Sequence, residues 1–96
     1  MLNSTSETNE TRLWTVYLIE CQDGTYYCGV CLLERLELRI AEHNSGKGAR
    51  YTSARYPVKL ITSTKGLNKQ QAYRLEYRVK KMRRDKKIAC LKNYRT

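Results

Sequence analysis

Apolar and polar residues alternate along the chain from residue 13 onward. The stretch 13–21, LWTVYLIEC, is rich in β-branched and aromatic residues and predicts a strand. Asp-Gly at 23–24 indicates a hairpin turn, and 26–31, YYCGVC, predicts the return strand. A period of two places Trp14, Val16 and Leu18 on one face and Tyr17 on the other. On the return strand, residues 27 and 29 share one face.

The next segment has helical spacing. Residues 32–44 carry Leu33, Leu36 and Ile40 at three- and four-residue steps, which predicts a helix with these side chains toward the core. Gly46 follows and is suited to end the helix in a left-handed conformation. Basic side chains recur at steps of four on an adjacent face of the same helix: Arg35, Arg39 and His43.

A third strand and a second helix complete the predicted elements. Residues 58–63 follow Pro57 and read as a strand. Asn68 and Gln71 have the spacing of a capping box, so we expect a helix from Asn68 to about Arg84. Its apolar stripe comprises Ala72, Leu75, Val79 and Met82, and Glu76 lies at the edge of this stripe.

The length of 96 residues and the composition favour one domain, which we place at residues 13–88. Residues 1–12 are polar and read as a disordered tail, and the structure of residues 89–96 is left open. The N-terminus lacks the features of a signal peptide, and no stretch approaches the roughly 18 apolar residues of a membrane helix. We therefore expect no membrane association and a cytoplasmic location.

The charge is strongly basic, with 19 Lys and Arg against 9 Asp and Glu, a net charge of +10. Between Glu42 and Asp85 the only acidic residue is Glu76. Such a field attracts polyanions through counterion release, so the charge favours nucleic-acid binding, with DNA and RNA both open. The alternative is a basic protein that associates with RNA or ribosomes.

Four cysteines raise the question of a metal site. Cys28 and Cys31 have ligand spacing, and Cys21 on the neighbouring strand is a possible third ligand. A zinc site of this type usually needs a second close pair, which the sequence lacks. We therefore favour reduced thiols that fill small positions.

Several polar side chains could together cleave a phosphodiester. Tyr17 and Tyr27 could orient or deprotonate water, and Arg39 could stabilise charge on phosphorus. His43 could share in proton transfer, and Glu76 could hold a divalent cation. Each has a structural alternative: packing for the tyrosines, a solvated helix face for the arginine and histidine, and ion pairing with Arg74, Lys80 or Arg83 for the glutamate.

The order of these residues resembles the GIY-YIG nuclease superfamily. Thr15-Val16-Tyr17, Tyr27-Cys28-Gly29, Arg39, His43 and Glu76 follow its motifs in sequence. Residues 14–87 resemble its small single-domain bacterial branch, the UPF0213 type, most closely at 43–50, HNSGKGAR, and 76–80, EYRVK. The first motif reads Thr-Val-Tyr instead of Gly-Ile-Tyr, which keeps the tyrosine. The run from Gly29 to His43 is about two residues longer than usual in the branch, and we choose Arg39 over Arg35 because it stands four residues before His43.

The resemblance implies an α/β fold, a three-stranded antiparallel sheet flanked by helices. It implies phosphodiester hydrolysis with one Mg2+, or Mn2+, held by Glu76. Tyr17 and Tyr27 would position or activate water, Gly29 would allow close packing, Arg39 would stabilise the transition state, and His43 would assist Tyr17 or contact phosphate. Which tyrosine is the base stays open.

We expect DNA as the substrate, with RNA as a possible partner. Two alternatives remain: a binding module of the same fold that cuts little or nothing, and a basic RNA-binding protein. The Tyr and Arg side chains of the loop after the first helix could bind RNA by stacking. The residues expected to bind nucleic acid are Lys47, Arg50, Tyr51, Arg55, Arg78 and Lys80.

Overall fold

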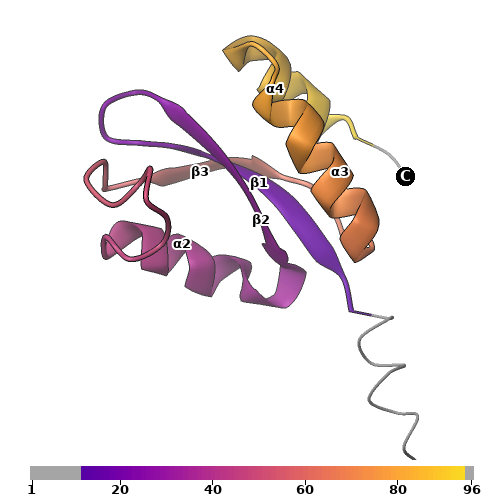
Figure 1. Cartoon of the computed structure of the whole chain (residues 1–96), viewed down its shortest axis with the longest axis horizontal. Helices are drawn as coiled ribbons and strands as arrows, with labels where there is room; N and C mark the ends of the chain where they lie inside the picture. The colour runs from indigo at the N-terminus through magenta and orange to yellow at the C-terminus, as the bar shows by residue number, and fades with distance from the viewer. Residues whose placement is uncertain (1–11, 95–96) are drawn as a thin grey trace, which may run out of the picture.

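The computed structural model describes residues 12–94. The tail predicted at 1–12 therefore lies outside the described residues except for Arg12, and residues 95–96 also lie outside them. Three strands, three α-helices and one short 3-10 helix make up the described chain (Figure 1). They are β1 (Trp14–Glu20), β2 (Tyr26–Leu32), η1 (Leu33–Arg35), α2 (Leu36–Asn44), β3 (Lys59–Ser63), α3 (Lys69–Lys80) and α4 (Arg84–Lys92).

The strands form one antiparallel sheet in the order β2-β1-β3. β1 lies in the centre because both other strands pair with it, and its five middle residues are buried. Between β1 and β2 the chain turns at Asp23-Gly24. Gly24 has φ +84°, and Asp23 Oδ1 accepts hydrogen bonds from the backbone N and the hydroxyl of Thr25. The turn predicted from Asp-Gly is confirmed.

Helices cover both faces of the sheet (Figure 1). On one face, Val16 and Leu18 pack with side chains of α3 and α4, including Leu75, Val79 and Leu91. On the other face, Tyr17 and Ile19 of β1 pack against Leu36 and Ile40 of the helix α2. The two faces expected from the period of two are confirmed, and so is the predicted α/β fold.

The first helix starts later than predicted. Leu32 pairs with Trp14 as the last residue of β2, and the backbone N of Leu33 donates to the carbonyl of Leu13. These contacts with β1 hold residues 32–33 beside the sheet, so α2 begins only at Leu36. At its other end Gly46 has φ +82°, the left-handed conformation expected there.

The second helix is two helices. The capping box of Asn68 and Gln71 is present, but α3 ends at Lys80 and α4 follows from Arg84. Glycine and proline are absent from the break. The turn between the two helices lets Met82 pack against the core. Leu91 of α4 is part of the same core and is 1% exposed. The apolar residues 88–91 are consecutive in sequence, without helical spacing, so their pattern did not reveal α4.

Within residues 12–94, none of the helices has both the length and the apolar character needed to cross a membrane.

Candidate active site

Tyr17 and Gly29 lie opposite each other on β1 and β2, on the face of the sheet that α2 covers. The Tyr17 side chain is 1% exposed. A Cβ atom at position 29 would lie 2.4 Å from both Cζ and Oη of Tyr17. Glycine leaves the room that the phenol occupies, which explains a glycine inside a strand.

His43 is fully buried and holds the Tyr17 hydroxyl. Its Nε2 lies 2.8 Å from Tyr17 Oη, and its Nδ1 lies 2.7 Å from Thr52 Oγ1. A Cβ atom at Gly48 would lie 2.4 Å from Nδ1, so glycine is needed there too. The sequence pattern did not point to Gly48 or Thr52, because their role depends on how the loop after α2 folds back onto His43. The only local signal was the second glycine of Gly-Lys-Gly.

The hydrogen bonds favour one tautomer of His43. Thr52 Oγ1 lies 3.2 Å from the carbonyl oxygen of Ala49, which can only accept. Because Thr52 has one hydroxyl proton, donating it to Ala49 leaves Oγ1 as the acceptor for an Nδ1–H of His43. Nε2 then carries the lone pair and accepts the hydroxyl proton of Tyr17. The result is a directed chain of hydrogen bonds from Tyr17 to the backbone.

Burial determines the charge of this pair. It lowers the pKa of His43 to about 4, and the positive charge of Arg39 acts in the same direction. Burial also raises the pKa of Tyr17 above its usual value, although a hydrogen bond and the charge of Arg39 oppose this rise. Both side chains are therefore neutral near pH 7, and Nε2 of His43 accepts a hydrogen bond from the Tyr17 hydroxyl.

Arg39 connects the buried pair to the solvent. Its Nη1 donates to Oε1 of Glu42 at 2.8 Å, and its side chain is 30% exposed. Burial acts to lower the pKa of Arg39, but its hydrogen bonds to Glu42 and Tyr17 outweigh this and raise it. Arg35, the alternative in the sequence, is exposed in η1 before the helix begins. Arg39 is thus the arginine that lies beside Tyr17.

Aromatic side chains cover the buried pair. The Tyr27 ring lies 5.3 Å from the His43 ring, and the Tyr51 ring stacks on Tyr27 at 5.9 Å and 19°. The guanidinium of Arg55 lies 4.1 Å from the centroid of Tyr51, and its Nε lies 3.0 Å from Oδ2 of Asp23. We call Tyr27, Tyr51 and Arg55 the cover. It joins β2, the loop after α2 and the hairpin turn.

Glu76 lies on α3 near the sheet edge formed by β2, the strand that carries Tyr27. Its Oε2 lies 3.2 Å from Nζ of Lys80, and its side chain is 17% exposed. Nζ of Lys80 in turn lies 5.9 Å from the centroid of the Tyr27 ring. The ion pair with Lys80 is one of the three alternatives expected from the sequence. It places the carboxylate near the edge strand β2, beside the cover.

The donor set at Glu76 fits one kind of metal ion. Among residues 12–94, no three His, Cys, Asp or Glu side chains converge on one point. Mg2+ commonly binds through one or two carboxylates and takes its other ligands from water and substrate phosphate. A single, mostly buried carboxylate fits that arrangement and not an all-protein cage. The ion would replace Lys80 as the partner of Glu76.

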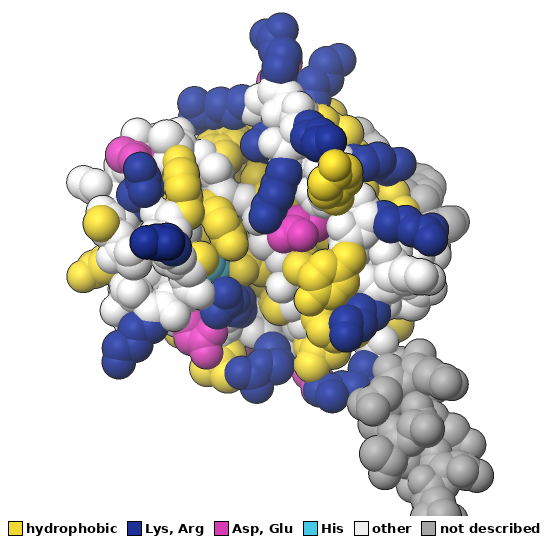
Figure 2. Space-filling view, in the orientation of Figure 1, with side chains coloured by type: hydrophobic (Ala, Val, Ile, Leu, Met, Phe, Trp, Pro, Cys, Tyr) yellow, Lys and Arg dark blue, Asp and Glu magenta, His cyan; other side chains and the backbone are white. Residues whose placement is uncertain are grey.

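The residues expected to bind nucleic acid fall into separate places. Lys47 and Arg50 are exposed on the loop after α2, where Tyr51 and Arg55 belong to the cover. Lys80 pairs with Glu76. Arg78 lies on the outer side of α3, in a shallow groove with two tyrosines. Figure 2 shows Lys and Arg side chains around most of the visible face, with few acidic ones among them.

The cysteines do not share a site. Cys28 lies in the core on the α3 side of the sheet, whereas Cys31 packs on the α2 side. Burial raises the pKa of the Cys28 thiol to about 12. Two side chains on opposite faces of a sheet cannot bind one ion together. The ligand spacing of Cys28 and Cys31 is therefore a coincidence of two core positions.

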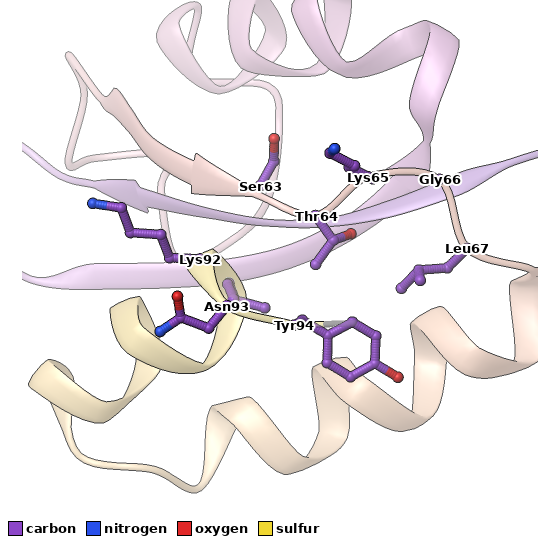
Figure 3. A pocket seen from close by; sticks show the side chains of 9 residues that line it. Ser63, Thr64, Lys65, Gly66, Leu67, Lys92, Asn93 and Tyr94 are labelled. Atoms are coloured by element: carbon purple, nitrogen blue, oxygen red, sulfur yellow. The ribbon is translucent and has the colours of Figure 1, made fainter. Parts of the chain in front are cut away.

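A separate hollow of about 530 Å³ lies between the segment after β3 and the end of α4 (Figure 3). Residues 63–67 and 91–94 line it. The residues expected at the active site are absent from its lining. The hollow is therefore distinct from the candidate active site.

Comparisons with known proteins show the family of the chain. Residues 13–89 match the sequence profile of the GIY-YIG catalytic domain. A UPF0213 protein of Nitratidesulfovibrio vulgaris is 44% identical over 79 residues, covering 82% of this chain and 70% of the relative. One of Halobacterium salinarum is 47% identical over 74 residues, covering 77% and 94%. The solution NMR structure of a UPF0213 protein from Bacillus halodurans is 41% identical, covers 77% of each chain and has a TM-score of 0.46.

The matched region contains every residue of the candidate active site, from Tyr17 to Glu76. The chain therefore belongs to the GIY-YIG nuclease domain family, with the UPF0213 proteins among its relatives.

Proposed function

We propose that this protein is a divalent-metal-dependent endonuclease that hydrolyses phosphodiester bonds in DNA. The observation that carries the proposal is the hydrogen-bond chain from Tyr17 through His43 to Thr52 beside the charge of Arg39. A solvated helix face would not bury its histidine, and a tyrosine kept only for packing needs no neutral imidazole on its hydroxyl. The family supports nuclease chemistry, and the net charge of +10 supports a polyanionic substrate.

The chain's own groups can move the required proton. Phosphate bound beside Arg39 would offset the positive charge that helps to lower the pKa of His43. Tyr17 Oη can then pass its proton to Nε2 of His43 while it takes a proton from the attacking water. The resulting hydroxide forms the new bond to phosphorus, the bond from phosphorus to the leaving oxygen breaks, and the proton held on His43 passes through water to that oxygen. Arg39 stabilises the charge that grows on the phosphate oxygens. When bound at Glu76, the divalent ion supplies Lewis-acid polarisation of the phosphate.

Opening of the cover would give a phosphate access to the buried pair. Tyr17 and His43 are at most 1% exposed, and the Tyr27 ring lies against His43, so separation of the stacked rings of Tyr27 and Tyr51 would uncover the imidazole. Substrate contacts with Lys47, Arg50 and Arg55 would favour this opening, since these cations lie on the same loop. Opening also brings Tyr27 to the attacking water, where it orients the nucleophile.

Nicking of supercoiled plasmid by the purified protein with Mg2+ or Mn2+ tests the proposal. We expect Tyr17→Phe, Arg39→Ala and Glu76→Gln to reduce nicking by roughly 100-fold or more, the usual scale for a base or charge-stabilising group, while DNA binding persists. Arg35→Ala and Glu37→Gln are matched controls on the exposed surface of the same region and should nick as wild type. Equal nicking by wild type and Glu76→Gln would reveal a contaminant and refute the proposal.

Burial of the reacting pair specifically favours a second candidate, the binding module that cuts little. Wild-type protein that binds duplex, branched and single-stranded DNA without cleaving any of them would establish it. A clear preference for structured RNA would instead establish the RNA-binding alternative.

A further inference from the structure

The solvent side of α3 carries exposed aromatic rings. Tyr73 is 45% exposed and Tyr77 is 64% exposed, although both lie on a regular helix. The buried residues of that helix are Ala72, Leu75 and Val79. At 100° per residue these point away from the tyrosines. Core packing therefore does not explain either ring, and such a face of a surface helix is normally polar.

A third ring extends this feature toward β1. The Trp14 ring is partly buried against the core and lies 5.7 Å from the Tyr73 ring, tilted by 53°. Tyr73 and Tyr77 stand four residues apart, about one helical turn. We call Trp14, Tyr73 and Tyr77 the aromatic row. It runs from the start of β1 along the outside of α3.

Cations accompany each ring of the row. Nζ of Lys69 lies 5.4 Å from the centroid of Trp14. Nζ of Lys81 lies 4.1 Å from the centroid of Tyr77 and 2.9 Å from its hydroxyl. Arg74 and Arg78 line the shallow groove that contains Tyr73 and Tyr77. In Figure 2 hydrophobic side chains lie among Lys and Arg over the region of α3.

Negative charge is kept off this face. The only acidic residue of α3 is Glu76, and its carboxylate pairs with Lys80 at the edge of the helix next to the candidate active site. Exposed rings alternate with cations on the rest of the outer face. A ligand for this surface needs flat π faces and regularly spaced negative charge. An unpaired nucleic-acid strand has both, whereas an acidic peptide lacks the repeated flat faces, and a duplex hides its base faces in the stack.

We propose that the aromatic row binds an unpaired DNA strand, with bases stacked on Trp14, Tyr73 and Tyr77 and phosphates on the cations beside them. The inference rests on the proposed function and names its substrate class: DNA in which a single-stranded segment lies next to the bond that is cut. Two rings of the row, Tyr73 and Tyr77, lie on the same helix as Glu76, with Tyr73 three residues before it. A strand on the row therefore leads to the edge of the active site.

Fluorescence anisotropy of a labelled single-stranded oligothymidine, measured with the full chain and without metal, tests the inference. Stacking strengths predict an affinity loss of roughly tenfold for each ring removed, so Tyr73→Ala/Tyr77→Ala, which removes two rings, should bind roughly 100-fold more weakly. Tyr77→Phe keeps the ring and should bind as wild type. Leu38→Ala removes an apolar side chain that is 50% exposed on α2 and should also have no effect. Circular dichroism checks that each variant is folded.

Competition with duplex DNA and with single-stranded RNA of the same length completes the test. Wild-type affinity of the double variant, an equal loss of duplex binding, or tighter binding of RNA than of DNA would each overturn the inference. Failure of the proposed function looks different: wild type would bind the oligonucleotide through the row but cleave neither plasmid nor a duplex that carries a single-stranded segment. If plasmid is nicked and the double variant binds like wild type, the endonuclease proposal stands and the aromatic row has no role.

Discussion

Tyr17 and His43 place two polar groups among apolar side chains, which costs free energy unless both are hydrogen-bonded. The two side chains are hydrogen-bonded to each other, and Thr52 forms a hydrogen bond with the second nitrogen of the imidazole. Within residues 12–94, no buried side-chain nitrogen or oxygen lacks a partner. The pair is therefore stable as long as His43 stays neutral. Protonation would leave a charge in the core with Arg39 beside it.

This predicts a pH dependence of stability. In the unfolded chain His43 binds a proton below its ordinary pKa of 6.5, whereas in the folded chain it does so only near pH 4. The unfolded state therefore binds more protons in this window, and the free energy of unfolding falls as pH drops. Urea unfolding should show a loss of roughly 2 kcal/mol between pH 7 and pH 5, a range above the ordinary pKa values of the carboxylates.

NMR of the imidazole gives an independent check, because the chain has one histidine. Its ring signals should titrate near pH 4 in the folded protein. A midpoint near 6.5 would contradict the buried, neutral imidazole and with it the proton path from Tyr17.

At the scale of elements, α3 has three distinct sides. One side packs Leu75 and Val79 into the core, an edge presents Glu76 toward β2, and the outer side carries the two tyrosines of the aromatic row. The helix is held against the sheet partly by α4, which the pattern of the sequence did not show. Because α4 covers the same core, it stabilises the position of α3 and hence of Glu76.

Leu91→Ala tests the contribution of α4. The side chain is 1% exposed in the core cluster, and its truncation should lower the free energy of unfolding by about 2–5 kcal/mol, as for other buried leucines. Leu38→Ala, at a half-exposed position, should change it by less than about 0.5 kcal/mol. The measurement is urea unfolding of both variants and wild type. A small effect of Leu91→Ala would mean that α4 does not contribute to the core.

At the scale of the whole molecule, the 96 residues carry a net charge of +10, and most acidic residues of the described chain are paired. Ion pairs are formed by Asp23, Glu34, Glu42, Glu76 and Asp85. The unpaired cations therefore dominate the field that a substrate meets. Such a field supports binding to any polyanion, so the charge alone cannot supply specificity. The aromatic row and the covered active site are the features that distinguish substrates.

The salt dependence of binding should report the cations that contact phosphate. For single-stranded DNA, log K falls with log[salt] by about 0.7 for each phosphate contact. Arg78→Ala should therefore make the slope shallower by about 0.7. Arg35→Ala, on the α2 side of the sheet, is the matched control and should leave the slope unchanged. An unaltered slope for Arg78→Ala would place the phosphate path elsewhere.

Much of the fold was determined by local features of the sequence. The alternation along 13–21 assigned Tyr17 and Trp14 to opposite faces, Asp-Gly placed the hairpin, and the Asn68–Gln71 box placed the start of α3. These features act over a few residues, because they depend on side-chain periodicity and on hydrogen bonds between near neighbours. The order of Tyr17, Gly29, Arg39, His43 and Glu76 was likewise visible as a family motif.

Only the tertiary structure decided what these residues contact. The sequence placed Arg39 and His43 alike on a helix face, but folding buried His43 under Thr52 and left Arg39 between Tyr17 and solvent. The folded structure also has a break after Lys80, and α4 forms from residues whose apolar positions lack helical spacing. Tyr73 and Tyr77 point outward, with Tyr73 next to Trp14. These outcomes depend on contacts between segments far apart in the chain. The free energy of such contacts comes from shared burial, which no local pattern encodes.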